Sequence, residues 1–169
     1  RAISKGSYEV ENVSETLSPS MDIQVASNFE RLLYDLNEGD DLQTIDAMKN
    51  IKEEEKYIIN QEKLDKINVH FLSARMSEEE VLKTISKVYE KFKIVLDPHS
   101  AIGYGAFDKI NLDGNNIVLA TAHPCKFPDA IKKAINLKED LPKELMFVME
   151  EKENYDILDN DVEKIKQHI

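Results

Sequence analysis

The chain has 169 residues, about the length of one domain, and 41% of them are hydrophobic, which is enough to bury a core. Its net charge of −11 argues against binding to nucleic acid or to an anionic membrane surface, because both need many Lys and Arg side chains. Its one cysteine cannot form an internal disulfide, and no apolar run approaches the ~18 residues of a membrane span. We therefore expect a cytoplasmic protein that binds neither nucleic acid nor a membrane.

Helical spacing of apolar residues predicts the first two helices. One covers residues 27–36, with Gly39 placed to close it, and the other covers residues 40–59. The run Val69–Leu72 reads as a short buried strand. Ser77 then begins a third helix as a capping box, with Glu80 three residues on.

The second half of the chain alternates apolar runs with helical patterns. The expected strands are residues 94–96, 117–121 and 155–158. The expected helices run from Pro98 to Ile110, from Phe127 to Ile135, and from about Asp161. Strands that alternate with helices are typical of an α/β fold with a mostly parallel sheet flanked by helices.

Three familiar kinds of chemical site find no support. The histidines at 70, 99 and 123 follow no compact metal-ligand spacing, so we predict no metal site. Cys125 and His123 lie two residues apart, but no oxyanion loop accompanies them, and we interpret Cys125 as a structural residue. A glycine-rich phosphate loop is also absent, since Gly103 and Gly105 lack a third glycine and the strand–turn–helix context of such a loop.

Asn28 and Arg31 leave two interpretations open. They lie three residues apart, so they share one face of the first helix. An arginine near a helix start could meet an anionic group. Equally, Glu30 and Arg31 could form an ordinary surface pair, with Ser27 as the N-cap.

Three segments resemble signatures of bacterial and fungal threonine synthases, in the same order and at similar spacing. They are TLSPSMDIQVASNFERLL at residues 16–33, LDPHSAIG at residues 96–103 and LATAHPCKFP at residues 119–128. The tail YDILDND at residues 155–161 is similar to the end of the family. Cys125 departs from the pattern, since alanine is common there.

The resemblance implies the C-terminal part of a pyridoxal-phosphate enzyme of the tryptophan-synthase-β fold type (fold type II). Residues 1–169 would then be the C-terminal part of the large, cofactor-binding domain. The implied reaction converts O-phosphohomoserine and water to threonine and phosphate. The Schiff-base lysine and the glycine-rich loop of the family have no match here, and the chain starts at Arg1 rather than Met. We therefore expect a missing N-terminal portion of the same enzyme, and no activity from these 169 residues alone.

The resemblance also assigns roles to individual residues. Thr121, Ser100 and His99 would bind the cofactor, with the Thr121 hydroxyl at the pyridine nitrogen. The substrate side would be formed by five residues: Ser18, Ser20, Asp22, Asn28 and Arg31. The segment around Ser18 could instead be a rigid loop that only packs a domain seam. The alternative functions are a non-catalytic binding module and another fold type II lyase, such as a threonine dehydratase.

Overall fold

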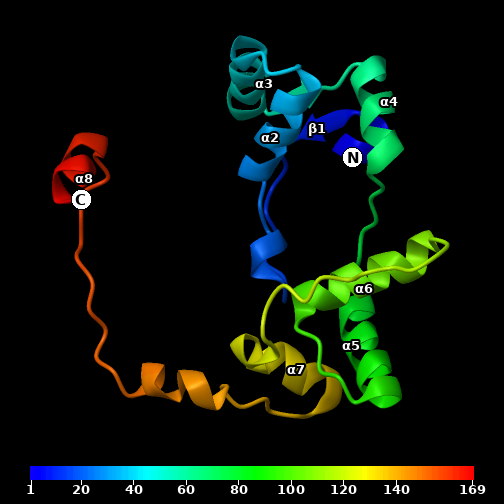
Figure 1. The fold of residues 1–169 in the computed structure, drawn as a ribbon, viewed down its shortest axis with the longest axis vertical. Coiled ribbons are helices and arrows are strands. Elements are labelled where there is room, and N and C mark those ends of the chain that lie inside the picture. Colours follow the sequence, from blue (N-terminus) through cyan, green and yellow to red (C-terminus); the bar gives the residue numbers. More distant parts are fainter. The chain divides into compact units, whose positions relative to one another are not determined.

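The structure is a computed structural model that describes residues 1–169, divided into two compact units, residues 1–139 and residues 140–169 (Figure 1). The first unit contains helices α1 (Ala2–Lys5), α2 (Ser27–Leu36), α3 (Asp41–Glu53), α4 (Gln61–His70), α5 (Glu78–Phe92), α6 (Pro98–Ile110) and α7 (Pro128–Ile135), strands β1 (Ser7–Glu9) and β2 (Lys56–Ile58), and 3₁₀ helices η1 (Pro19–Met21) and η2 (Pro124–Lys126). The second unit contains the 3₁₀ helix η3 (Lys143–Met149) and helix α8 (Val162–His168). None of the helices is both long and apolar enough to span a membrane.

Most of the predicted helices are confirmed. Helix α2 has the expected bounds, although Ala26 rather than Ser27 is its N-cap. Helix α5 begins with the capping box, since the Ser77 side chain accepts from the backbone of Glu80 and the Glu80 carboxylate accepts from the Ser77 N–H. Helix α6 begins at Pro98, as predicted. The N-terminal signals were therefore local enough to place these helices.

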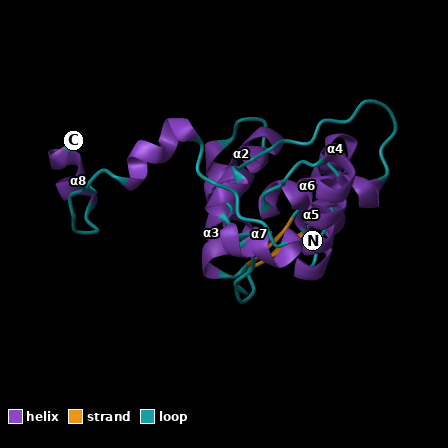
Figure 2. Ribbon diagram, turned by 90° about the horizontal axis from the view of Figure 1, so that it is seen from below, coloured by secondary structure: helices purple, strands orange, loops and turns teal.

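The helix expected over residues 40–59 is shorter than predicted. Helix α3 ends at Glu53, and Glu55 takes a left-handed φ of 55° before β2 begins. Acidic side chains are unfavourable at a helix C-terminus, and β2 gains backbone hydrogen bonds by pairing with β1 instead. The two strands are antiparallel, with Tyr8 opposite Tyr57, and form a two-stranded sheet (Figure 2).

The four apolar runs expected as strands differ from the prediction. Val69 and His70 end α4, and none of residues 94–96, 117–121 and 155–158 pairs into a sheet. A strand needs a neighbour for its backbone groups, and these runs have none within the chain. The run 117–121 also leaves apolar side chains in solvent: Ile117 is 89% exposed and Leu119 is 74% exposed. The structure thus forms an antiparallel pair in place of the expected parallel sheet.

The core of the first unit consists of three buried clusters. Two share partners and lie around α2, α3 and α4: Leu33, Ala47, Met48 and Ile51 form one, and Ile59, Leu64 and Ile67 form the other. The third joins α5 to α6 and α7 (Figure 1) and consists of Val81, Ile85, Ala101 and Ile131. This third cluster fixes the start of α6, where the polar residues of the candidate site lie.

Candidate functional site

A turn before α2 forms one wall of a pocket. The Thr16 N–H and hydroxyl both donate to the Asp22 carboxylate, over 2.8 and 2.9 Å. Between these residues the Met21 N–H donates to the Ser18 carbonyl, which closes η1. Pro19 at its first position presets the backbone for this tight turn. The Asp22 side chain therefore braces the turn that carries Ser18 and Ser20.

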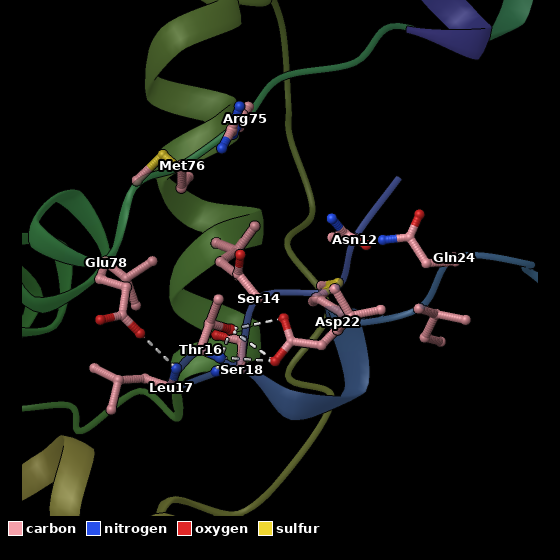
Figure 3. Close-up of a pocket in the computed structure, with 15 residues that line it drawn as sticks. Asn12, Ser14, Thr16, Leu17, Ser18, Asp22, Gln24, Arg75, Met76 and Glu78 are labelled. Carbon is pink, nitrogen blue, oxygen red and sulfur yellow. Dashed lines mark hydrogen bonds between the residues drawn. The ribbon is translucent and has the colours of Figure 1, made fainter. Parts of the chain in front are cut away.

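The pocket lies between this turn and the start of α5 (Figure 3). Its volume is about 320 Å³. The Leu17 N–H donates to Oε1 of Glu78 over 2.7 Å and ties the two walls together. Arg75 is the one cation among the lining residues, and Asp22 and Glu78 are the acids. Ser18, buried as a residue, offers the pocket a hydroxyl that makes no hydrogen bond within the chain.

A buried polar cluster lies at the N-terminus of α6. The Asp97 carboxylate caps the helix: one oxygen accepts from the N–H and Nδ1 of His99, over 2.9 and 3.0 Å. The other oxygen accepts from the N–H of Ser100 and from its hydroxyl. Exposure of Asp97 is 1%, of His99 6% and of Ser100 2%. Four donors thus satisfy a carboxylate that water barely reaches, as burial of a charge requires.

This cluster contacts two distant segments of the chain. His99 Nε2 accepts from the Ser20 N–H over 3.2 Å, and Ser100 Oγ accepts from the Thr121 N–H over 3.0 Å. Because Nε2 accepts, the proton of the neutral imidazole lies on Nδ1, where Asp97 holds it. The His99 ring also packs against Phe127, with 4.7 Å between ring centroids.

The structure brings together most of the residues predicted for the site, but not all of them. Two line the pocket, Ser18 and Asp22, and a hydrogen-bonded network joins four others: Ser20, His99, Ser100 and Thr121. Arg31 lines a different hollow on α2, beside Glu30 and Tyr34, and Asn28 is exposed on the same helix. The structure therefore does not group Asn28 and Arg31 with the other candidates.

Sequence reasoning missed three residues that build the site. Asp97 lies in the segment at residues 96–103 that carries the resemblance, but its role as the centre of the cluster was not predicted. Glu78 lies between Ser77 and Glu80 of the predicted capping box without a role of its own, and no sequence pattern indicates Arg75. Leu17 and Glu78 lie 61 residues apart and Ser20 and His99 lie 79 apart, so only tertiary packing reveals these contacts.

Comparison with known proteins places this arrangement in a class. A solved structure of pyridoxal-phosphate-bound threonine synthase from Brucella melitensis matches 99% of the chain with a TM-score of 0.83 and 37% identity. The yeast threonine synthase structure matches 99% with a TM-score of 0.77 and 34% identity. Nearly the whole chain therefore shares the fold of the corresponding part of these threonine synthases, which is consistent with an α/β fold.

Sequence comparison identifies the family. Residues 100–169 match the family model described as threonine synthase, C-terminal. Threonine synthases of Pseudomonas aeruginosa and Saccharomyces cerevisiae are 34% and 35% identical over the whole chain. The chain belongs to the threonine synthase family. It spans only 37% and 38% of the lengths of these two relatives.

Proposed function

We propose that this chain is the C-terminal part of the large domain of a threonine synthase. Together with a region equivalent to the N-terminal part of its relatives, it would convert O-phosphohomoserine and water to threonine and phosphate in the cytoplasm. The observation that carries the proposal is similarity to threonine synthases over the full chain, in sequence and in fold. Pyridoxal phosphate is the cofactor we propose, since the Brucella melitensis relative has it bound.

The surroundings of Thr121 leave its hydroxyl available to a pyridine ring. The Thr121 backbone is held by Ser100, while its side chain is exposed and its hydroxyl makes no hydrogen bond within the chain. A hydroxyl at the pyridine nitrogen leaves that nitrogen largely unprotonated, whereas a carboxylate would hold it protonated. When bound, the cofactor supplies an electron sink for carbanion chemistry. We propose that Thr121 contacts the ring nitrogen and that Ser100 and His99 support it.

The pocket beside the turn is our candidate for the substrate side. Ser18 offers it a free hydroxyl, and Arg75 offers a cation that could balance an anionic group. Asp22 shapes this wall through its two bonds to Thr16. Asn28 and Arg31 are proposed substrate contacts from a separate surface on α2.

The unpaired apolar runs support a larger sheet in the whole enzyme. Residues 94–96 and 117–121 are apolar and lack strand partners, yet they flank α6, and Ile94 and Leu96 line one hollow together with Val118 and Leu119. We propose that both become strands of a mostly parallel sheet when the rest of the large domain supplies neighbours. Packing of the added elements against the faces of this sheet would also cover Ile117 and Leu119.

The proposal is tested by assaying the full-length protein with O-phosphohomoserine. We expect threonine and phosphate in equal amounts, dependent on added pyridoxal phosphate. A Ser18→Ala variant should raise the KM more than it lowers kcat. Ammonia release from threonine without phosphate release from O-phosphohomoserine would contradict the proposal and favour a dehydratase.

A further inference from the structure

We propose that Asp97 is a positioning residue that holds the Ser20 turn and the Thr121 segment in fixed places through two neighbouring side chains. This inference rests on the proposed function, because the turn lines the candidate substrate pocket and Thr121 is the candidate cofactor contact. Asp97 itself contacts neither pocket wall, and it would act only through His99 and Ser100.

The first arm runs through His99 to the turn. Asp97 holds the proton on Nδ1, which leaves the Nε2 lone pair for the Ser20 N–H. Packing against Phe127 restricts rotation of the ring. Ser20 lies between Ser18 and Met21, which both line the pocket. A change in His99 is therefore transmitted to the pocket through the turn.

The second arm runs through Ser100 to Thr121. The Ser100 hydroxyl donates to Asp97, which directs its lone pair toward the Thr121 N–H. The Thr121 backbone is otherwise irregular and has no sheet partner, so this bond fixes the place from which its hydroxyl projects. The same carboxylate therefore sets both arms.

The chemistry of the cluster explains why aspartate is needed at this position. Each carboxylate oxygen accepts two donors, and no lysine or arginine pairs with it. An asparagine would keep one acceptor oxygen and turn an N–H₂ group toward the other pair of donors. Asp97→Asn should therefore release one arm and keep the other.

Hydrogen exchange of the full-length protein separates the two arms. We expect His99→Ala to speed exchange in peptides covering residues 18–22 by about tenfold and to leave residues 119–123 unchanged. Ser100→Ala should speed exchange at residues 119–123 and leave residues 18–22 unchanged. Asp97→Ala should speed exchange in both peptides. Equal acceleration across the whole protein in every variant would mean general destabilisation and would overturn the proposal.

Two substitutions of His99 provide a matched pair. In His99→Gln the amide oxygen takes the place of Nε2 and can still accept from Ser20. In His99→Asn the amide can reach Asp97 but not Ser20. We expect His99→Ala to raise the KM for O-phosphohomoserine by about tenfold. Compared with His99→Ala, His99→Gln should slow exchange at residues 18–22 again and bring the KM back toward the wild-type value, whereas His99→Asn should do neither. Equal behaviour of the two variants would overturn the proposal.

The exchange measurement needs no activity, so the two proposals fail in different ways. If wild-type protein makes no threonine but the variants separate the two arms, the proposed function fails and the positioning network stands. If the wild type is active but His99→Ala leaves both KM and exchange at residues 18–22 unchanged, the positioning role is wrong and the proposed function stands.

Discussion

The backbone N–H of Leu17 lies 2.7 Å from Oε1 of Glu78, the first residue of α5, and donates a hydrogen bond to it. The carboxylate is doubly suited to this place, since negative charge is favourable at a helix N-terminus and the turn has an unpaired N–H to offer. One side chain therefore connects the turn that carries Ser18 to the helix that forms the opposite wall of the pocket (Figure 3).

Removal of the Glu78 side chain should loosen the contact between the turn and the start of α5. We expect Glu78→Ala to lower the free energy of unfolding by less than about 1 kcal/mol, because the bond is exposed. The local effect should be larger: faster hydrogen exchange at Leu17 and a higher KM. Glu78→Gln keeps an acceptor oxygen and should behave almost as wild type. Glu79→Ala is the control, because Glu79 pairs only with Lys83 on the helix surface, and an equal effect there would contradict the argument.

Local signals in the sequence were sufficient for the helix starts but not for the sheet. The Ser77–Glu80 spacing and Pro98 each act within one helical turn, so they favour a helix start whatever packs around them. The runs at 94–96 and 117–121 are apolar, but a strand exists only beside another strand. Val69 was expected in a strand; instead α4 reaches His70, because Leu64 and Ile67 bury one face of that helix.

In the candidate site, too, the sequence indicates individual residues, whereas their contacts depend on tertiary packing. Pro98 predicts the helix start beside the cluster, and the resemblance names Ser18, His99 and Thr121. What joins them is a set of contacts between residues far apart in sequence, such as Ser20 with His99. No spacing rule contains that information, because it depends on how the turn packs against α6.

Substitutions of Thr16 and Asp22 distinguish two roles of Asp22, bracing of the turn and direct contact with the substrate. Asp22→Ala removes both bonds and should cost about 1 kcal/mol, with a higher KM. Thr16→Val removes the hydroxyl bond to Asp22 and also the acceptor of the Ser18 N–H, over 3.1 Å, and should give an effect of the same sign. If Asp22 only braces the turn, then Asp22→Ala combined with Thr16→Val should be worse than Asp22→Ala alone only by the lost Ser18 N–H bond, about 1 kcal/mol. A much greater loss in the double variant, measured by KM and urea unfolding, would show an independent role for each residue.

Because Gly105 has no side chain, Met76 has room to lie in the wall of the pocket. A Cβ atom at this position of α6 would lie 2.2 Å from Cε of Met76 and 3.2 Å from Oγ1 of Thr84. Gly105→Ala must therefore displace the Met76 side chain, which lines the pocket. Alanine is favoured in helices by about 1 kcal/mol, which offsets part of the strain.

We therefore expect little change in the thermal unfolding of Gly105→Ala but a higher KM. Adding Met76→Ala removes the clashing side chain and should lower the KM again relative to Gly105→Ala alone. A KM that stays at the wild-type value in Gly105→Ala would contradict a role for Met76 in shaping the pocket.

Gly6→Ala is the contrasting variant. Gly6 has a φ of 67° and its Cβ would lie 3.0 Å from the backbone oxygen of Ile59, so it should lower stability by about 1–3 kcal/mol.

Glu80 gives the structure a defined response to acid. Lys109 Nζ lies 2.7 Å from its Oε1, and the Ser77 N–H donates to Oε2, also over 2.7 Å. The side-chain bond to Lys109 and then the backbone bond to Ser77 lower the pKa of Glu80 from its ordinary 4.5 to about 2. A carboxylate with a lowered pKa stabilises the fold above the unfolded value, so this contribution is present above about pH 4.5 and is lost as the pH falls toward 2.

A titration of the Glu80 carboxyl carbon by NMR should therefore have its midpoint near pH 2. Lys109→Met should raise the pKa of Glu80 toward 4.5 but leave it lowered in part, because the Ser77 bond remains. Lys83→Met is the matched control, since Lys83 lowers the pKa of the neighbouring Glu79 and should affect Glu80 little. Lys109 also donates to the backbone oxygen of Arg75, over 2.6 Å, so its loss should loosen the segment that carries Arg75 to the pocket. An ordinary pKa of Glu80 in the wild type would contradict the effect of the Lys109 contact, which joins α6 to α5.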